Sequence, residues 1–192
     1  MVAPLLIAGQ WRAADNCTGS FRAIDPSSGQ AIGVEFPRSG AADVEQALAA
    51  ASAAAPLLAA VEPSRIAAFL EGYAAALEAD VEALVALAHA ETGLPAATRL
   101  RGNELPRTCN QLRLAAQAAR SASWTRPIVD TAAGLRSCHA PLGKPVLVFG
   151  PNNFPFAFNA VAGSDFASAI AARSPVIAKA HPSHPATSKL LA

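Results

Sequence analysis

The sequence predicts an α/β protein, because its C-terminal part follows the order strand, helix, strand, helix. Two short apolar runs, residues 146–149 and 176–179, are each preceded by proline, which is typical of buried strands. A helical pattern over about 156–172 separates them, and Pro185 can begin a further helix that continues to Ala192. Such a βαβ unit implies parallel strands in one sheet.

The N-terminal part predicts a small β region followed by helices. Residues 5–35 alternate apolar runs with Asp-Pro and Ser-Gly turn signals, and 32–36 reads as a strand. Apolar residues then recur at helical spacing in three stretches, 44–58, 66–77 and 81–88. A fourth helix is expected over about 97–121. Ser39 or Asp43 is expected to cap the first helix, and Asp80 the third. Gly93 is expected to end the third helix. Pro106 predicts a kink or a late start in the fourth helix.

Residues 122–141 change in character and predict a hairpin, so we place boundaries at both of its ends. The chain then divides into 1–121, 122–141 and 142–192. Two parallel strands do not make a stable sheet, because both faces of a parallel sheet need cover. We therefore expect the sequence to end within a domain.

Composition excludes several classes of protein. The 15 basic and 14 acidic side chains give a net charge of +1, which argues against a nucleic-acid partner. Hydrophobic residues make up 52% of the chain, although 48 of them are alanines, so the chain is expected to fold. The most apolar stretch, 146–162, is broken by glycine, proline and asparagine, and predicts no membrane span. Three cysteines without a CxxC motif predict reduced thiols, no metal site and a cytoplasmic location.

The segment FGPNNFPF at residues 149–156 is the first candidate site. It follows a strand at the carboxyl end, where open α/β sheets bind ligands. Asn152 and Asn153 each carry a carboxamide, whose N–H groups suit a developing oxyanion. The alternative is a plain turn, in which asparagine is also favoured.

The segment KAHPSHP at residues 179–185 is the second candidate site. Lys179 ends the second strand of the βαβ unit, where dinucleotide folds bring the adenosine ribose. A solvated lysine is the alternative. His181 and His184 lack a nearby carboxylate or thiolate, so we expect no metal there. Cys109 and the other two cysteines, Cys17 and Cys138, lack the context of an activated thiol.

These two segments resemble the aldehyde dehydrogenase superfamily, and the likeness extends over essentially the whole chain. It is strongest to the bacterial branch of α-ketoglutaric semialdehyde dehydrogenases and NADP-dependent fatty-aldehyde dehydrogenases. Three more segments support that branch, namely ETGLP at 91–95, ELPRTCNQLR at 104–113, and the alanine-rich run at 157–172.

The resemblance implies the N-terminal portion of an aldehyde dehydrogenase fold, incomplete, with a β arm, helices and the start of a Rossmann-like coenzyme domain. Residues 1–121 would form the β arm and helices of the coenzyme domain, 122–141 part of an oligomerisation hairpin, and 142–192 the first βαβ unit. By resemblance Asn153 is the oxyanion donor, and NAD or NADP is the coenzyme. The implied coenzyme contacts are Phe149, Gly150, Pro151 and Asn152 on the nicotinamide side, Lys179 at the ribose, and His181 and Pro182 flanking it.

The resemblance also implies that the nucleophilic cysteine and the general-base glutamate lie further along the chain, because no Gly-Gln-x-Cys or Glu-x-Gly-Gly segment is present. The expected function is oxidation of an aldehyde, with 2,5-dioxopentanoate as one candidate, by a homo-oligomer of complete chains. The 192-residue chain alone is expected to be inactive. The alternatives are a non-catalytic remnant that binds a nucleotide or subunit, and an acyl-phosphate or acyl-CoA reductase, which the Asn-Phe-Pro segment disfavours.

Overall fold

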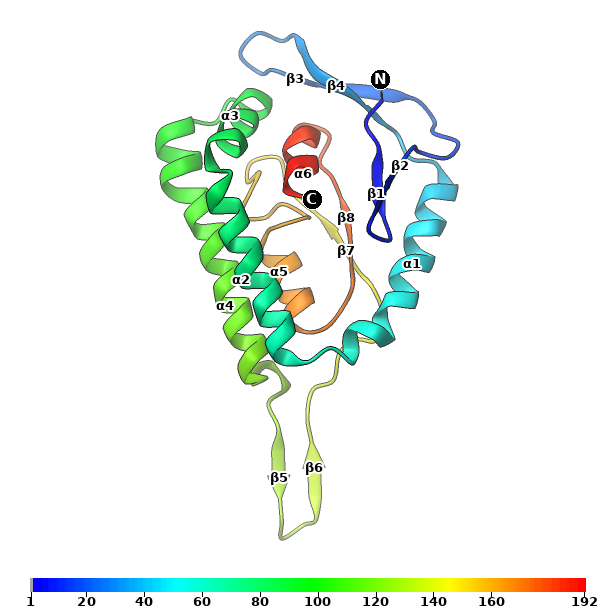
Figure 1. The fold of residues 1–192 in the computed structure, drawn as a ribbon, viewed down its shortest axis with the longest axis vertical. Helices are drawn as coiled ribbons and strands as arrows, with labels where there is room; N and C mark the ends of the chain where they lie inside the picture. Colours follow the sequence, from blue (N-terminus) through cyan, green and yellow to red (C-terminus); the bar gives the residue numbers. More distant parts are fainter. Residues whose placement is uncertain (1) are drawn as a thin grey trace.

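A two-stranded parallel sheet lies at the centre of the molecule, in a computed structural model that describes residues 2–192 (Figure 1). Strand β7 (Val146–Phe149) pairs with β8 (Val176–Lys179) in the register Val146 to Val176 and Phe149 to Lys179. The connection between them contains helix α5 (Ser164–Ala171), and α6 (Pro185–Leu191) follows β8. The predicted α/β fold with a βαβ unit is therefore confirmed.

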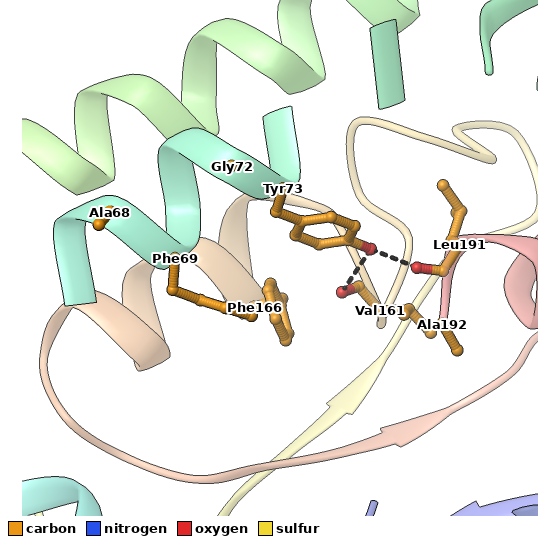
Figure 2. Close-up of a pocket in the computed structure, with 8 residues that line it drawn as sticks. All are labelled: Ala68, Phe69, Gly72, Tyr73, Val161, Phe166, Leu191 and Ala192. Atoms are coloured by element: carbon orange, nitrogen blue, oxygen red, sulfur yellow. Dashed lines mark hydrogen bonds between the residues drawn. The ribbon is translucent and has the colours of Figure 1, made fainter. Parts of the chain in front are cut away.

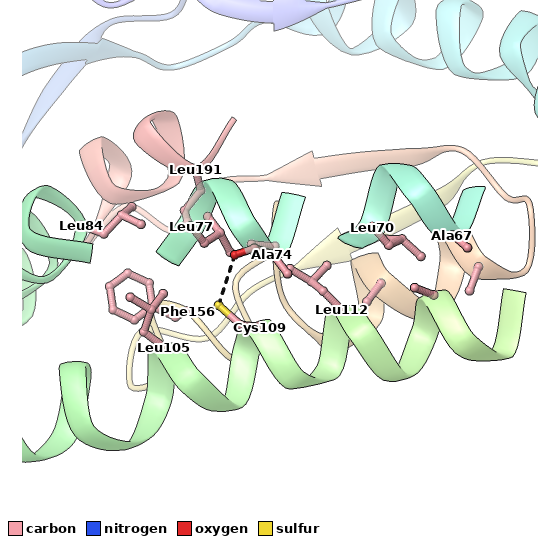
Figure 3. Close-up of a cluster of buried hydrophobic side chains, with 14 of the residues drawn as sticks. Ala67, Leu70, Ala74, Leu77, Leu84, Leu105, Cys109, Leu112, Phe156 and Leu191 are labelled. Atoms are coloured by element: carbon pink, nitrogen blue, oxygen red, sulfur yellow. Dashed lines mark hydrogen bonds between the residues drawn. The ribbon is translucent and has the colours of Figure 1, made fainter. Parts of the chain in front are cut away.

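A helical layer packs beside this sheet and holds most of the core. It consists of α2 (Pro63–Ala79), α3 (Val81–Thr92) and α4 (Leu105–Ser121), with α5 on its inner side (Figure 1). Helices α2 and α4 lie along each other with small residues such as Ala67 and Ala74 fully buried between larger side chains such as Leu112 (Figure 3). Small side chains permit this close approach, which explains how an alanine-rich sequence still forms a packed interior.

The N-terminal arm forms two antiparallel hairpins and a long helix on the other side of the sheet (Figure 1). The hairpins are β1 (Leu5–Ile7) with β2 (Gln10–Arg12), and β3 (Ser20–Ile24) with β4 (Ala31–Pro37). Helix α1 (Ala41–Ala59) follows. A third hairpin, β5 (Ile128–Asp130) with β6 (Leu135–Ser137), projects away from the body of the molecule, and every residue of its strands is exposed (Figure 1).

Two of the expected helices have other bounds in the structure. The helix expected over 156–172 is shorter, because 156–163 form a series of turns and α5 begins only at Ser164. The fourth helix divides into a π-helical segment, Ala96–Glu104, and α4, whose first turn contains Pro106. The expected late start is thus confirmed, since proline is accommodated best in a first helical turn.

The predicted side-chain caps are wrong. Gly40 and not Ser39 or Asp43 is the cap residue of α1, and Asp80 precedes α3 without a side-chain cap hydrogen bond. Asp43 is instead buried inside the first turn of α1 and accepts a hydrogen bond from the Asp15 backbone N–H at 2.9 Å. Gly93 does end α3, in the left-handed conformation (φ 67°).

The two central strands are also less buried than predicted. Val148 is buried, whereas Leu147 and Phe149 are more than half exposed. None of the helices in residues 2–192 is both long enough and apolar enough to cross a bilayer.

Candidate functional site

The two segments that the sequence singles out lie side by side at the carboxyl edge of the sheet. Because Phe149 pairs with Lys179, the loops that follow β7 and β8 leave the sheet at the same level. Phe149 and Lys179 are exposed, as are Asn152 and Asn153 on the first loop. This is the place where open α/β sheets bind ligands.

A histidine joins the two loops. His184, fully buried before α6, lies with its Nε2 at 3.0 Å from the carbonyl oxygen of Pro151. Since that carbonyl can only accept, Nε2 carries the hydrogen, and Nδ1 is left without a hydrogen-bond partner among the described residues. The ring of His181 stacks on His184 at 5.2 Å between centroids. Burial, His184 and Lys179 all lower the pKa of His181.

The loop after β7 is compact where it turns back toward α5. A Cβ atom at Gly150 would lie 2.9 Å from the Ala160 nitrogen and 3.0 Å from the Phe158 oxygen, so only glycine allows this approach. The buried Asn159 donates from Nδ2 to the Pro155 oxygen at 2.9 Å and accepts from the Val161 N–H at 2.9 Å. These contacts fix the end of the loop from within.

A buried carboxylate from the helical layer fixes the same loop from outside. Glu104, at the end of the π-helical segment, is fully buried, and its Oε1 accepts the backbone N–H groups of Phe156 at 2.8 Å and Ala157 at 3.1 Å. Its Oε2 lies 3.4 Å from Nη2 of Arg99, an ion pair without hydrogen-bond geometry. The same Nη2 of Arg99 donates to the Asn153 carbonyl oxygen at 3.1 Å.

A second buried carboxylate holds the segment after β8. Glu91, in the last turn of α3, accepts the backbone N–H groups of Ala186 at 2.9 Å and Thr187 at 2.7 Å, and the Thr187 hydroxyl at 2.7 Å. These are the first amides of α6, which would otherwise lack partners. A negative charge at this end also interacts favourably with the helix dipole.

Sequence reasoning identified the exposed residues of this edge but missed the buried groups that hold it. It included Glu91 and Glu104 only in two motifs of the resemblance, and gave neither of them nor Arg99 an individual role. A signal was present, because Glu91 continues the buried face of α3 marked by Leu84 and Ala88. A carboxylate at such a position must find a buried partner.

The cysteines of the chain lie apart from these loops. Cys109 is buried in the core between α4 and α2, where its Sγ lies 3.7 Å from the Ala74 carbonyl oxygen (Figure 3). Burial, and to a lesser extent Glu78, raise the pKa of Cys109 to about 11, so its thiol is protonated near neutral pH. Cys17 and Cys138 are exposed, in the N-terminal arm and after β6.

An open apolar groove lies beside α2 and α5, and Val161 and the end of α6 also line it (Figure 2). Among the side chains that line it, only that of Tyr73 is titratable, and its hydroxyl donates to the Leu191 carbonyl oxygen at 2.7 Å. None of the side chains that line the groove is a charged group or a thiol, so we base the candidate site on the loops. It is lined by Ala68, Phe69, Gly72, Tyr73, Val161, Phe166, Leu191 and Ala192.

Comparison with known proteins relates the chain to aldehyde dehydrogenases. A model described as the aldehyde dehydrogenase family matches residues 11–192. Alpha-ketoglutaric semialdehyde dehydrogenase 2 of Azospirillum brasilense is 45% identical to the chain over 183 residues, which is 90% of this chain and 34% of that protein.

Solved structures show the same fold. PnpE from Pseudomonas sp. WBC-3, in complex with nicotinamide adenine dinucleotide, is 28% identical with a TM-score of 0.77, over 92% of this chain and 35% of that one. A mutant of AldC from Pseudomonas syringae, complexed with NAD+ and octanal, has a TM-score of 0.85 at 23% identity, over 98% of this chain and 37% of that one. The chain thus spans about a third of the length of these relatives.

Proposed function

The chain belongs to the aldehyde dehydrogenase family, as its motifs predict, and we propose that it supplies part of the coenzyme site and one oxyanion donor of an enzyme that oxidises an aldehyde to a carboxylic acid. The observation that carries the proposal is the pairing of Phe149 with Lys179, which puts both candidate loops at one edge of the sheet. The coenzyme would be NAD or NADP.

A nicotinamide coenzyme, when bound, would accept the hydride in this oxidation. The residues at the sheet edge fit such a group, because Gly150 lets the first loop pack closely against residues 158–160 and Lys179 offers an exposed cation at the second. Since Glu91 already accepts the first amides of α6, we assign the charged contact to Lys179 and not to that helix end. The remaining proposed contacts are Phe149, Pro151, Asn152, His181 and Pro182.

Asn153 is the proposed donor to the oxygen of the reacting aldehyde. Its carboxamide has no hydrogen-bond partner within residues 2–192, although its own carbonyl oxygen is held by Arg99. A neutral N–H donor stabilises negative charge that develops on oxygen without titrating near neutral pH. The main chain is therefore fixed while the donor group stays available.

The thiol that attacks the aldehyde and the base that assists it are proposed to come from sequence outside residues 1–192. Cys109 does not fit the role, because it is buried and its pKa is raised. We therefore expect residues 1–192 alone to show no aldehyde oxidation. The cytoplasmic location expected from three cysteines stays a prediction.

The proposed substrate is an aldehyde that also carries a carboxylate, of which 2,5-dioxopentanoate is the first candidate. The support is the Azospirillum brasilense relative, whose name specifies α-ketoglutaric semialdehyde. The hairpin of β5 and β6 supports assembly into a homo-oligomer, because its apolar residues Ile128, Val129 and Leu135 are more than half exposed.

The test uses a chimera in which residues 1–192 replace the matched third of the Azospirillum brasilense relative. Asn153→Ala should lower kcat by about 10²–10³ with little change in coenzyme Kd, because one oxyanion donor is lost. Asn152→Ala, the matched control, should do much less. Equal kcat values for the wild-type, Asn153→Ala and Asn152→Ala chimeras would refute the oxyanion role and make Asn153 an ordinary turn residue. A wild-type chimera that binds NAD or NADP and oxidises nothing would favour a non-catalytic nucleotide-binding remnant.

A further inference from the structure

The loop that carries Asn153 is held at two points by two side chains that also contact each other. Arg99 holds the carbonyl oxygen of Asn153, and Glu104 holds the amides of Phe156 and Ala157. Both come from the π-helical segment Ala96–Glu104, which is far from the loop in sequence.

The π-helical geometry explains why Arg99 and Glu104 can act together. They are five residues apart, and at 100° per residue an α-helix would place them well off a common face. In this segment the backbone N–H of Leu100 donates to the Pro95 oxygen at 3.1 Å, and that of Leu105 donates to the Leu100 oxygen, which is the i→i+5 pattern of a π-helix. Residues five apart therefore share a face, and Oε2 of Glu104 meets Nη2 of Arg99 at 3.4 Å.

The environment of the pair makes it rigid. Glu104 is fully buried, and the Arg99 side chain is only 28% exposed. The Arg99 guanidinium carbon lies 4.4 Å from the centroid of the Phe154 ring, which limits its rotation. Hydrogen bonds to charged groups are stronger than those between neutral groups, and a buried carboxylate without its partners would be costly.

We propose that Arg99 and Glu104 are a positioning pair for Asn153, and that they set the place of its carboxamide by fixing the main chain on both sides of Phe154 and Pro155. The proposal rests on the proposed role of Asn153 as the oxyanion donor. Such a donor needs placement within about half an ångström, and displacement by about 1 Å can cost 10²-fold in rate. Neither side chain of the pair needs to touch the substrate.

Amide exchange tests the positioning independently of catalysis. It is measured by mass spectrometry on residues 1–192 and on the chimera, in peptides that separate 153–158 from 185–188. Glu104→Ala should speed exchange at Phe156 and Ala157 by about tenfold or more, since a tenfold change corresponds to about 1.4 kcal/mol. Glu91→Ala is the matched control, because it removes an equally buried carboxylate that holds Ala186 and Thr187 instead. Unchanged exchange at Phe156 and Ala157 relative to Glu91→Ala would overturn the proposal.

Kinetics of the chimera test the consequence for Asn153. Glu104→Gln and Arg99→Ala should lower kcat by about 10- to 100-fold with KM for the coenzyme nearly unchanged, and Arg99→Lys should restore part of the loss. If kcat is normal in these variants but lowered in Asn153→Ala, the positioning role of the pair is refuted while the proposed role of Asn153 stands. An unimpaired Asn153→Ala would refute the proposed function, while the exchange experiment would still decide whether the pair holds the loop.

Discussion

Replacing Glu91 by alanine should destabilise the protein more than the same replacement of an exposed glutamate in the same helix. The carboxylate of Glu91 accepts three hydrogen bonds from Ala186 and Thr187, and it is 2% exposed. Glu91→Ala leaves two backbone N–H groups of α6 without a partner. α6 also loses the negative charge at its N-terminal end.

The size of the effect follows from those contacts. Each buried N–H that loses its partner costs about 1–3 kcal/mol, so two give about 2–6 kcal/mol. Water that enters the vacated space reduces this, and we expect about 3 kcal/mol. For a chain of this length, 1 kcal/mol shifts Tm by about 2–4 °C, which predicts a decrease of about 6–12 °C.

Thermal unfolding followed by circular dichroism checks this value. Glu82→Ala is the matched control, because Glu82 lies in the first turn of the same helix, has a side chain that is 75% exposed and pairs with Arg101 at the surface. Exposed ion pairs contribute little, so its Tm should stay close to that of the wild type. Equal Tm values for the two variants would show that Glu91 does not hold α6.

Three further predictions concern single side chains. Lys179→Ala in the chimera should raise the Kd for NADP about tenfold or more, and the Kd for NAD by less, if the ammonium group meets the 2′-phosphate. Titration with each coenzyme measures the two Kd values. If both are unchanged, Lys179 is only a solvated residue at the end of a strand. Burial raises the pKa of Tyr73, the only tyrosine, above the ordinary value of about 10, so its stabilising contribution is complete below pH 10 and is lost as the pH rises further. Tyrosinate absorbance should therefore appear together with alkaline unfolding, and titration near pH 10 in the folded chain would contradict the burial. Cys17 and Cys138 should react with a disulfide reagent in the folded chain, whereas Cys109 should react only after unfolding, because burial raises its pKa to about 11.

The sequence predicted the elements whose signals are local. The strands β7 and β8 are short apolar runs between breakers, and their parallel pairing follows from the helix that connects them. Gly93 and Pro106 affect the backbone at their own positions, and the end of α3 and the start of α4 agree with what they predict. The family assignment also rested on contiguous motifs, and it is confirmed.

The errors in the fold have non-local causes. The helix expected over 156–172 begins eight residues late; within the segment before it the Asn159 side chain takes the N–H of Val161, and Glu104, 52 residues earlier in the chain, holds the N–H of Phe156. Asp43 was expected to cap a helix, but it accepts the N–H of Asp15, which is 28 residues away. In each case the difference comes with a side-chain hydrogen bond to the main chain, and helix propensity alone does not reveal such a bond.

The helical glutamates show how such contacts can still be inferred from a sequence. Glu71 and Glu78 of α2 are exposed, and each pairs with an arginine of α4 at the surface. Glu91 instead follows Leu84 and Ala88 on the buried face of α3, and Glu104 follows Leu100 by four residues. A carboxylate in register with buried leucines cannot reach solvent, so it has to meet either a buried cation or the free amides of another element. Both of these glutamates meet amides, and both sets of amides lie on the segments that border the carboxyl edge of the sheet. A glutamate on an apolar helix face is therefore a pointer to a loop or helix end that the fold holds in place, and in this chain it points to the candidate site.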